Sequence, residues 1–380
     1  MKYGHLEQLK VACRMLSPVF IGSGGSLTKK EYIFDPEKAL IYLPDLFKLV
    51  AFLKERRLLP SYEQYLTQTR SNDLCLFLRQ HQIAEKDYTA FVRYSIEAGE
   101  AARAANFREV LTFVKGPDGK PYIPGSSIKG AIRTALAARL LKKGNWGSLQ
   151  NSVESEANNY RGPRHYLDRE CKSIEERIFD RLGISDTKHP NNRIPAPIND
   201  FMRGIQVGDS SPLEYSSLIL AGKYERKPDG SVKVLPIFRE CLRPGSTAHF
   251  ALTLDLPVLA KTGIDQKYIE DALHAFSDEH YAAFEEHFPE SSEDAPIAAD
   301  EGVDLILGGG AGYVSKTLTY NLFADRRSAL SLTAKILDKQ FARHKHAMDP
   351  GVYKVSPHIL KTVLYKNCYY QMGRCELIFN

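Results

Sequence analysis

Residues 122–136, YIPGSSIKGAIRTAL, contain the clearest helix start in the chain. An apolar, strand-like approach leads into a helix whose first turn can be capped by Ser126 or Ser127. Lys129 and Arg133 are four residues apart, so both lie on one face of that helix. The free N–H groups and the helix dipole favour an anion at the same end, which predicts a phosphate site. The alternative is a capped helix with two solvated bases.

Two further Gly/Ser-rich turns also follow apolar, strand-like segments: IGSGGS at 21–26 and GGGAGYVSK at 308–316. Backbone N–H groups in such turns can approach the phosphates of a polymer closely, because glycine has no side chain. The alternative is a tight turn that binds nothing. The residues predicted to make the contacts are Gly22, Ser23, Gly24 and Gly25 in the first turn, and Gly309, Gly310 and Lys316 in the second.

The stretch LILGGGAGYVSKTLTY at 305–320 also invites comparison with the nucleotide-binding pattern G-x-x-x-x-G-K-[ST]. If Gly310 is the first glycine of that pattern, Ser315 stands where the last glycine is required. A serine adopts the backbone conformation needed there only with strain. In addition, only 63 residues follow Thr317, too few for the further strand–helix units of a nucleotide fold. A nucleotide-dependent enzyme is therefore disfavoured.

Charge is distributed unevenly along the 380 residues, although the net charge is only +5. Residues 257–307 hold 13 acids and 2 bases, or −11, so the rest of the chain carries +16. Residues 308–380 alone hold 11 bases and 4 acids, or +7. A basic body of this kind predicts a polyanionic partner, whereas the acidic segment is expected to face solvent or a basic neighbour.

The overall composition is that of an ordinary globular protein, with 43% hydrophobic and 26% charged residues. No apolar run approaches the ~20 residues that a membrane helix needs, so no membrane association is expected. The first 15 residues lack the apolar core of a signal peptide, and a cytoplasmic location is therefore expected.

The six cysteines are spread out without a C-x-x-C pair, which predicts reduced and mostly buried thiols. A zinc site from His344, His346, Cys368 and Cys375 is disfavoured because their spacing is irregular. We therefore predict no metal ion and no cofactor.

The order of the expected elements indicates the architecture. Residues 5–16 alternate as a half-buried strand, residues 45–110 have helical spacing, and a strand begins at Phe238. A helix over about 268–287 is followed by a short strand, the glycine-rich turn, another helix and a last strand. Strand–helix–strand–loop–helix–strand is the order of a ferredoxin-like unit, and the first half has the same skeleton.

We therefore predict an α+β fold of two tandem ferredoxin-like units. The first spans 1–235, with a helical insertion at about 45–110 and a loop-rich insertion at about 144–200. The second spans 236–380 and contains the glycine-rich loop 308–316. In the helix that starts near Ser126, one stripe is expected to be buried, formed by Ile132, Ala135, Leu136 and Leu140.

No catalytic set is evident in the sequence. The histidines His5, His165, His189 and His249 are scattered, and none stands beside a recognisable nucleophile or acid motif. Asp186-Thr187 and Asp209-Ser210-Ser211 fit turns at strand ends as well as they fit chemistry. We therefore predict no catalytic residues, although residues of a nuclease site could still converge in space.

Four stretches occur in an order that resembles the RAMP superfamily of CRISPR-associated proteins. They are SPVFIGSGG, YIPGSSIKGAIRTAL, FRECLRPGSTAHFALTLD and LILGGGAGYVSKT. The IPGSS-x-KGA-x-R pattern is specific to the superfamily, and the ordered set is most similar to the family of the fifth Csm subunit of type III-A effector complexes. The regions 45–110 and 144–200 carry none of the resemblance.

This resemblance implies two ferredoxin-like, RNA-recognition-motif-like RAMP domains. It also implies binding of the guide RNA (crRNA) at its 3′ end, beside the repeated backbone RAMP subunit, with a role in guide maturation and assembly but no established catalysis. The small helical Csm subunit and host ribonucleases are further expected partners. On this view the three Gly/Ser turns contact RNA. The alternative is a RAMP-type endoribonuclease that processes guide RNA or cleaves target RNA.

Overall fold

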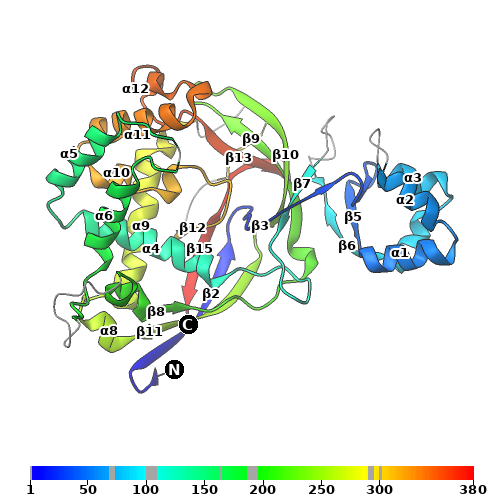
Figure 1. The fold of residues 1–380 in the computed structure, drawn as a ribbon, viewed down its shortest axis with the longest axis horizontal. Helices are drawn as coiled ribbons and strands as arrows, with labels where there is room; N and C mark the ends of the chain where they lie inside the picture. The colour runs from blue at the N-terminus through cyan, green and yellow to red at the C-terminus, as the bar shows by residue number, and fades with distance from the viewer. Residues whose placement is uncertain are drawn as a thin grey trace.

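The fold was analysed in a computed structural model of the 380-residue chain. The structure describes residues 2–67, 73–99, 109–162, 164–185, 196–289, 295–298 and 302–380. It has an α+β architecture, as predicted, in which two sheets are covered by helices on one side (Figure 1). The predicted candidate His189 and the central part of the loop-rich insertion lie outside the described residues.

The first sheet lies at the centre of the molecule and has the order β12-β15-β2-β11-β8, with β1 added to β2. In β2 the residues Val11, Cys13 and Met15 are buried on the core face, as expected for a strand with one face on the core, and the small Ala12 is buried as well. The strands are β1 (Lys2–Tyr3), β2 (Leu6–Met15), β8 (Ile205–Val207), β11 (Thr247–Asp255), β12 (Leu305–Ile306) and β15 (Arg374–Phe379).

The second sheet has the order β3-β7-β10-β9-β6-β5-β4, and the hairpin β13–β14 joins it through β9. Both sheets combine strands from before and after residue 235, and β10 itself crosses that residue, so the division of the chain at 235 stays a prediction. The strands are β3 (Gly22–Thr28), β4 (Ile33–Asp35), β5 (Leu40–Pro44), β6 (Val92–Glu97), β7 (Glu109–Phe113), β9 (Leu218–Arg226), β10 (Val232–Leu242), β13 (Leu360–Tyr365) and β14 (Cys368–Gln371).

The helices of the main body gather on one side of the central sheet (Figure 1). The helix predicted near Ser126 is α4, and all four residues of its predicted apolar stripe are buried. The helices are α4 (Gly125–Leu141), α5 (Gly147–Glu156), α6 (Asp168–Phe179), α7 (Ala196–Asn199), α8 (Leu256–Ala260), α9 (Gln266–Ala283), α10 (Thr319–Leu322), α11 (Arg326–Gln340) and α12 (Asp349–Val352).

The acidic segment lies against a basic neighbour, as expected. Its helix α9 packs along α4, where Asp271 pairs with Arg139 at 3.4 Å and Glu279 pairs with Lys142. The guanidinium of Arg139 also lies 4.7 Å from the centre of the Tyr268 ring. Bases near the C-terminus of α4 are therefore used to hold the acidic helix in place.

The helical insertion is shorter than predicted. Its helices are α1 (Leu46–Glu55), α2 (Leu59–Thr67) and α3 (Leu74–Gln80), and a single-turn helix ends it at Ala90. The following segments of the predicted 45–110 region are strands β6 and β7, because their residues pair into the second sheet. The three helices enclose a separate apolar cluster and form a lobe at the edge of that sheet (Figure 1).

The region predicted to be loop-rich, 144–200, contains more helix than expected, since both α5 and α6 lie in it. Leu149 and Val153 of α5 are buried against the main core. Among the described residues, no helix is both long and apolar enough to span a membrane.

Candidate nucleic-acid interface

Two of the three Gly/Ser turns meet in space. The backbone N–H of Gly309 donates to the carbonyl oxygen of Phe20 at 2.6 Å, so the glycine-rich loop lies directly on the segment that precedes β3. A Cβ on Gly308 would come within 2.2 Å of the same Phe20 oxygen, and one on Gly310 would come within 2.5 Å of the Met372 sulfur. Gly308 and Gly310 also have positive φ angles of +79° and +87°, which other residues rarely adopt.

Close packing against protein atoms explains why glycines are needed in this loop, and no bound nucleotide is required to explain them. The loop packs on protein backbone, and Ser315 is buried with its hydroxyl donating to the Gly312 carbonyl at 3.2 Å. Lys316 ends a single 3₁₀ turn, Val314–Lys316, rather than beginning a helix that could hold phosphates at its N-terminus. The nucleotide-loop reading is therefore rejected on geometry as well as on sequence.

A basic cluster lies beside this packed loop and consists of Lys223, Arg239, Lys361 and Lys316. In the antiparallel ladder Arg239 of β10 is opposite Ala221 of β9, and Lys361 of β13 is opposite Glu225. Directly opposed residues share a face, and so do residues two apart along a strand. Arg239, Lys223 and Lys361 therefore project from one face of three adjacent strands.

Burial and mutual repulsion shape the electrostatics of the basic cluster. Burial lowers the pKa of Lys361, and the positive charges of Lys223, Arg239 and Lys316 lower it further. Burial also lowers the pKa of Lys316 and of Arg239. Glu225 of β9 pairs with Lys223 at 2.6 Å, and its negative charge opposes the lowering of the Lys361 pKa. An uncompensated positive charge therefore remains, and a bound anion would stabilise it.

Arg239, in the basic cluster, has a guanidinium nitrogen that lacks a hydrogen-bond partner among the described residues. This atom, Nη1, is buried. The guanidinium lies 5.5 Å from the centre of the Phe20 ring, which fixes its plane. A buried guanidinium N–H without a partner is costly, and a phosphate oxygen is the partner that its fork geometry suits.

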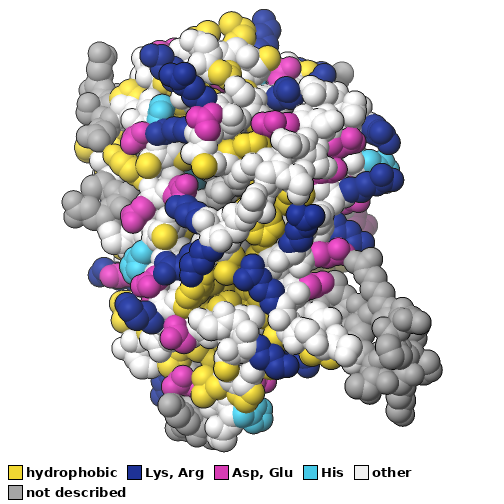
Figure 2. Space-filling view, turned by 90° about the vertical axis from the view of Figure 1, so that its left-hand side faces the viewer, with side chains coloured by type: hydrophobic (Ala, Val, Ile, Leu, Met, Phe, Trp, Pro, Cys, Tyr) yellow, Lys and Arg dark blue, Asp and Glu magenta, His cyan; other side chains and the backbone are white. Residues whose placement is uncertain are grey.

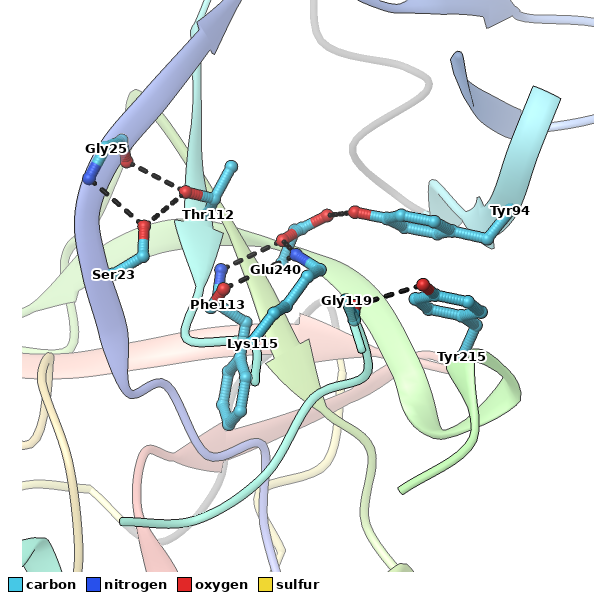
Figure 3. A network of polar contacts seen from close by, with 9 residues as sticks. All are labelled: Ser23, Gly25, Tyr94, Thr112, Phe113, Lys115, Gly119, Tyr215 and Glu240. Carbon is cyan, nitrogen blue, oxygen red and sulfur yellow. Dashed lines mark hydrogen bonds and ion pairs between the residues drawn. The ribbon is translucent and has the colours of Figure 1, made fainter. Parts of the chain in front are cut away.

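The first Gly/Ser turn forms an exposed bulge at the edge of the same sheet. The register between β3 and β7 jumps from Gly22 opposite Phe113 to Ser26 opposite Leu111, so the residues between them protrude. The Ser23 hydroxyl contacts that of Thr112 at 2.6 Å and accepts from the Gly25 N–H at 3.1 Å (Figure 3). The structure thus presents Gly22, Ser23, Gly24 and Gly25 at the surface, and their contact with RNA stays a prediction.

A buried carboxylate holds the strands beneath this bulge together. Glu240 accepts from the Tyr94 hydroxyl at 2.6 Å, from the Phe113 N–H at 2.9 Å and from Lys115 at 2.5 Å (Figure 3). The Tyr94 ring stacks on that of Tyr215 with centres 4.2 Å apart. Because Glu240 follows Arg239 in β10, this network also fixes the strand that carries the guanidinium.

The start of α4 differs from its predicted arrangement. Neither Ser126 nor Ser127 caps the helix, because it begins one residue earlier and both serines lie inside its first turn. The Gly125 N–H donates instead to the Asp209 carboxylate at 2.8 Å, which supplies the cap from a distant part of the chain. A Cβ on Gly125 would come within 2.2 Å of the Val207 oxygen, so this end of the helix lies tightly against β8.

The two predicted phosphate-binding bases of α4 have protein surroundings. Arg133 pairs with Asp200 at 2.6 Å, and its guanidinium lies 3.4 Å from the centre of the Phe179 ring. Lys129 is half-buried, and burial lowers its pKa. Arg133 is therefore not a solvated base, because Asp200 and Phe179 of the insertion 144–200 contact it. Direct contact of either residue with RNA stays a prediction.

The helical face of the molecule offers no comparable concentration of positive charge. In Figure 2 lysine and arginine side chains on this face alternate with aspartate and glutamate. Such alternation is typical of a solvated surface. The basic cluster differs from this face because three of its four bases, Lys223, Arg239 and Lys361, are half-buried.

The histidines do not assemble a catalytic site at the basic cluster. His5, His165 and His249 are exposed and far apart in the sequence. His280 is buried, lies 2.5 Å from Glu285 and has a pKa that burial lowers. Glu285 also pairs with the buried Arg374, beside a cavity of about 720 Å³ that Asp278 helps to line. The acids make that cavity a poor place for RNA.

The cysteine prediction is confirmed: all six thiols are free, and Cys13, Cys75, Cys241 and Cys375 are buried. The disfavoured zinc set does not come together, because neither Cys368 nor Cys375 belongs to the group of potential metal ligands found among the described residues.

Sequence reasoning found Lys316 but missed Lys223, Arg239 and Lys361. The pairing of β9 with β13 could not be predicted from the sequence. A register argument needs the partner strand, and β13 begins more than 130 residues after β9 ends.

Comparison with known proteins supports the fold and extends it to a family. The model of the RAMP superfamily matches residues 12–304, which include both Gly/Ser turns of the first half and the strands β8 and β11 of the central sheet. A protein named Csm5 from Mycobacterium tuberculosis is 30% identical, with 98% of each chain covered. Csm5 from Streptococcus thermophilus is also 30% identical, with 97% of this chain and 96% of the relative covered.

Two solved structures share the fold. One belongs to a cryo-EM structure of a Csm–crRNA–target RNA ternary complex of a type III-A CRISPR-Cas system, with a TM-score of 0.61, 20% identity, and 97% of this chain and 100% of that chain covered. The other is the crystal structure of T. onnurineus Csm5, with a TM-score of 0.58, 18% identity, and 96% and 99% covered.

The fold is therefore that of a RAMP protein, and the tandem ferredoxin-like class predicted from the sequence is confirmed. The chain belongs to the RAMP superfamily and, within it, to the Csm5 family.

Proposed function

We propose that the chain is an RNA-binding subunit of a type III-A (Csm) antiviral effector complex that holds the 3′ end of the guide RNA beside the repeated backbone RAMP subunit. Relatives named Csm5 match over nearly the whole length, and one solved structure with this fold comes from a Csm–crRNA–target RNA complex. The observation that carries RNA contact in this chain is the basic cluster with its unpartnered buried Arg239 N–H.

The chemistry of the basic cluster favours the phosphate backbone over the bases. Arg239 can donate two parallel hydrogen bonds to one phosphate, whereas the lysines act as point charges on its neighbours. Phosphate contacts fix the position and register of a strand but carry no sequence information. The subunit can therefore bind guides of any sequence, which is necessary if it holds every guide.

We further propose that the subunit is not itself catalytic and that it supports guide maturation by shielding RNA. The carboxylate beside the basic cluster, Glu225, is held by Lys223, and the cluster contributes no histidine that could act as a general base. Host ribonucleases would then trim the guide up to the shielded end. The small helical Csm subunit is proposed as an additional neighbour in the assembly.

Reconstitution of the complex with and without this subunit tests the proposal. Both assemblies are treated with a 3′→5′ exonuclease, and the guide 3′ ends are mapped. A longer protected guide is expected in the complete complex, because its 3′ end is covered. Identical 3′ ends in the two assemblies would contradict the proposed position of the subunit. RNA cleavage by the isolated chain, lost on substitution of a cluster residue, would support the endoribonuclease alternative instead.

A further inference from the structure

A buried cluster of potential metal ligands lies away from the basic cluster, between α11 and β13. It consists of His346, Asp349 and His358, with exposed fractions of 5%, 0% and 8%. His346 Nδ1 is 2.9 Å from Asp349 Oδ2, and His358 Nδ1 is 2.6 Å from Oδ1 of the same carboxylate. One ligand atom from each residue lies within 4.8 Å of the others.

The surrounding structure holds the three side chains in place. The Tyr353 ring stacks on His358 with centres 4.9 Å apart, and the exposed ring of His344 stacks on His346 at 5.8 Å. The backbone of Ala347 is tied to α11, because its N–H donates to Asp338 at 3.2 Å. Ligands positioned in advance by packing and hydrogen bonds reduce the conformational cost of binding an ion.

We propose that His346, Asp349 and His358 bind one divalent transition-metal ion of the Zn²⁺ class, which cross-links the connection between α11 and β13. Two imidazole nitrogens and one carboxylate oxygen suit Zn²⁺, whereas Mg²⁺ and Ca²⁺ prefer oxygen ligands alone. In a tetrahedral Zn²⁺ site the ligand atoms lie about 3.3 Å apart. The two His–carboxylate contacts of 2.9 and 2.6 Å therefore widen by about 0.4 and 0.7 Å, and a pair of ligand atoms near the 4.8 Å limit closes by about 1.5 Å. A solvent molecule completes the coordination.

The charge balance also favours an ion at this cluster. With neutral imidazoles, the buried group carries the single negative charge of Asp349. Each Nδ1 now faces a carboxylate oxygen, so for coordination its proton moves to Nε2 and the free lone pair turns to the ion. The ion then replaces two N–H···O contacts with three metal–ligand bonds, and no redox step is involved.

Metal titration of the tag-free, full-length protein tests this proposal. After treatment with EDTA and dialysis, Zn²⁺ is added in competition with a chromogenic chelator, and Co²⁺ is added separately while its visible spectrum is recorded. One tightly bound equivalent of Zn²⁺ and the absorption bands of low-coordinate Co²⁺ are expected, with no competition from millimolar Mg²⁺. Zn²⁺ should also raise the melting temperature.

Variants assign the site to these residues. His346→Ala and His358→Ala should each weaken Zn²⁺ binding at least tenfold, while the matched control His344→Ala keeps it. Asp349→Asn preserves the shape of the side chain and should lose the Zn²⁺-dependent rise in melting temperature. Because the wild type is measured first, misfolded variants leave the test intact: absence of a stoichiometric Zn²⁺ equivalent and of Co²⁺ bands in the wild type would overturn the proposal. Equal Zn²⁺ binding by folded His346→Ala and His358→Ala would overturn it too.

Discussion

At the scale of single residues, the glycines of the 308–316 loop differ in how strongly each position excludes a side chain. Gly308 combines a φ of +79° with a Cβ position 2.2 Å from the Phe20 oxygen, whereas Gly312 has a φ of +100° and open space around it. Gly308→Ala therefore adds a clash with backbone to backbone strain. We expect it to lower the free energy of unfolding by about 2–5 kcal/mol, and Gly312→Ala by about 1–2 kcal/mol. Urea denaturation measures both, and an equal loss would show that packing on Phe20 is unimportant.

The basic cluster makes the second prediction at the residue scale. Arg239→Ala and Lys361→Ala should each weaken binding of single-stranded RNA, because each removes one charged phosphate contact worth about 1.5–3 kcal/mol, or roughly 10- to 150-fold in affinity. The matched control is Lys267→Ala, which removes one positive charge from a side chain that is 82% exposed on the acidic helix. Fluorescence anisotropy with labelled RNA provides the measurement. If Lys267→Ala weakens RNA binding as much as the two cluster variants, the loss of affinity comes from net charge and not from specific phosphate contacts.

At the scale of secondary-structure elements, the cap of α4 comes from outside the helix. Asp209→Ala removes the acceptor of the Gly125 N–H and should destabilise the protein by about 1 kcal/mol. Ser126→Ala and Ser127→Ala should each change stability by less than about 0.5 kcal/mol, because neither side chain caps the helix. Thermal or urea unfolding measures the stability of the three variants. A larger loss of stability in a serine variant than in Asp209→Ala would show that a serine caps the helix.

The lobe of α1–α3 supplies another element-scale prediction. Pro44 and Val92 are register partners in β5 and β6, so the chain leaves and re-enters the sheet at adjacent points. Replacement of residues 45–91 by an Asn-Gly turn should leave a folded main body, because the lobe buries its own apolar cluster.

Circular dichroism of the excised protein should show less helix but still a cooperative thermal transition, with RNA affinity unchanged within error. The matched control is Leu53→Ala in the intact chain, which opens a cavity in the lobe core alone. Loss of cooperative unfolding or of RNA binding in the excised protein would make the lobe part of the main body or of the interface.

At the scale of the whole molecule, RNA binding should depend on salt and pH in a way set by the basic cluster. Four phosphate contacts on a single strand give a log–log salt slope of about −3. The lysine pKa values are lowered in the free protein, so the charged forms are lost as pH rises through those lowered values.

Affinity should therefore begin to fall, as pH rises, below the ordinary lysine pKa of about 10.4. For folding the sign is reversed: the partly buried ammonium groups cost stability below the lowered pKa, and that cost is lost as pH rises from the lowered pKa to the ordinary one. Anisotropy titrations across salt and pH measure the binding effects. A flat salt response, or a decline that starts only at the ordinary lysine pKa, would argue against this cluster as the interface.

Local sequence patterns determined many of the helices, strands and turns of this protein. The alternation of 5–16, the apolar stripe of α4, the acidic helix α9 and the glycine-rich turns were all readable from the sequence, because periodicity and backbone freedom are local properties. The order of these elements and the four stretches of resemblance also indicated the α+β class and the RAMP superfamily. The strand β6 was missed because residues 45–110 were taken as one helical region.

Only the tertiary structure decided which side chains share a site. The cap of α4 by Asp209, the engagement of Arg133 by Asp200, and the meeting of Gly308–Gly310 with Phe20 each join segments far apart in the chain. Arg239, Lys223 and Lys361 form one surface only because β10, β9 and β13 pair in a particular register. Register is fixed by which face of each strand the core buries, and that is settled collectively when the whole sheet forms, not by any one strand's sequence.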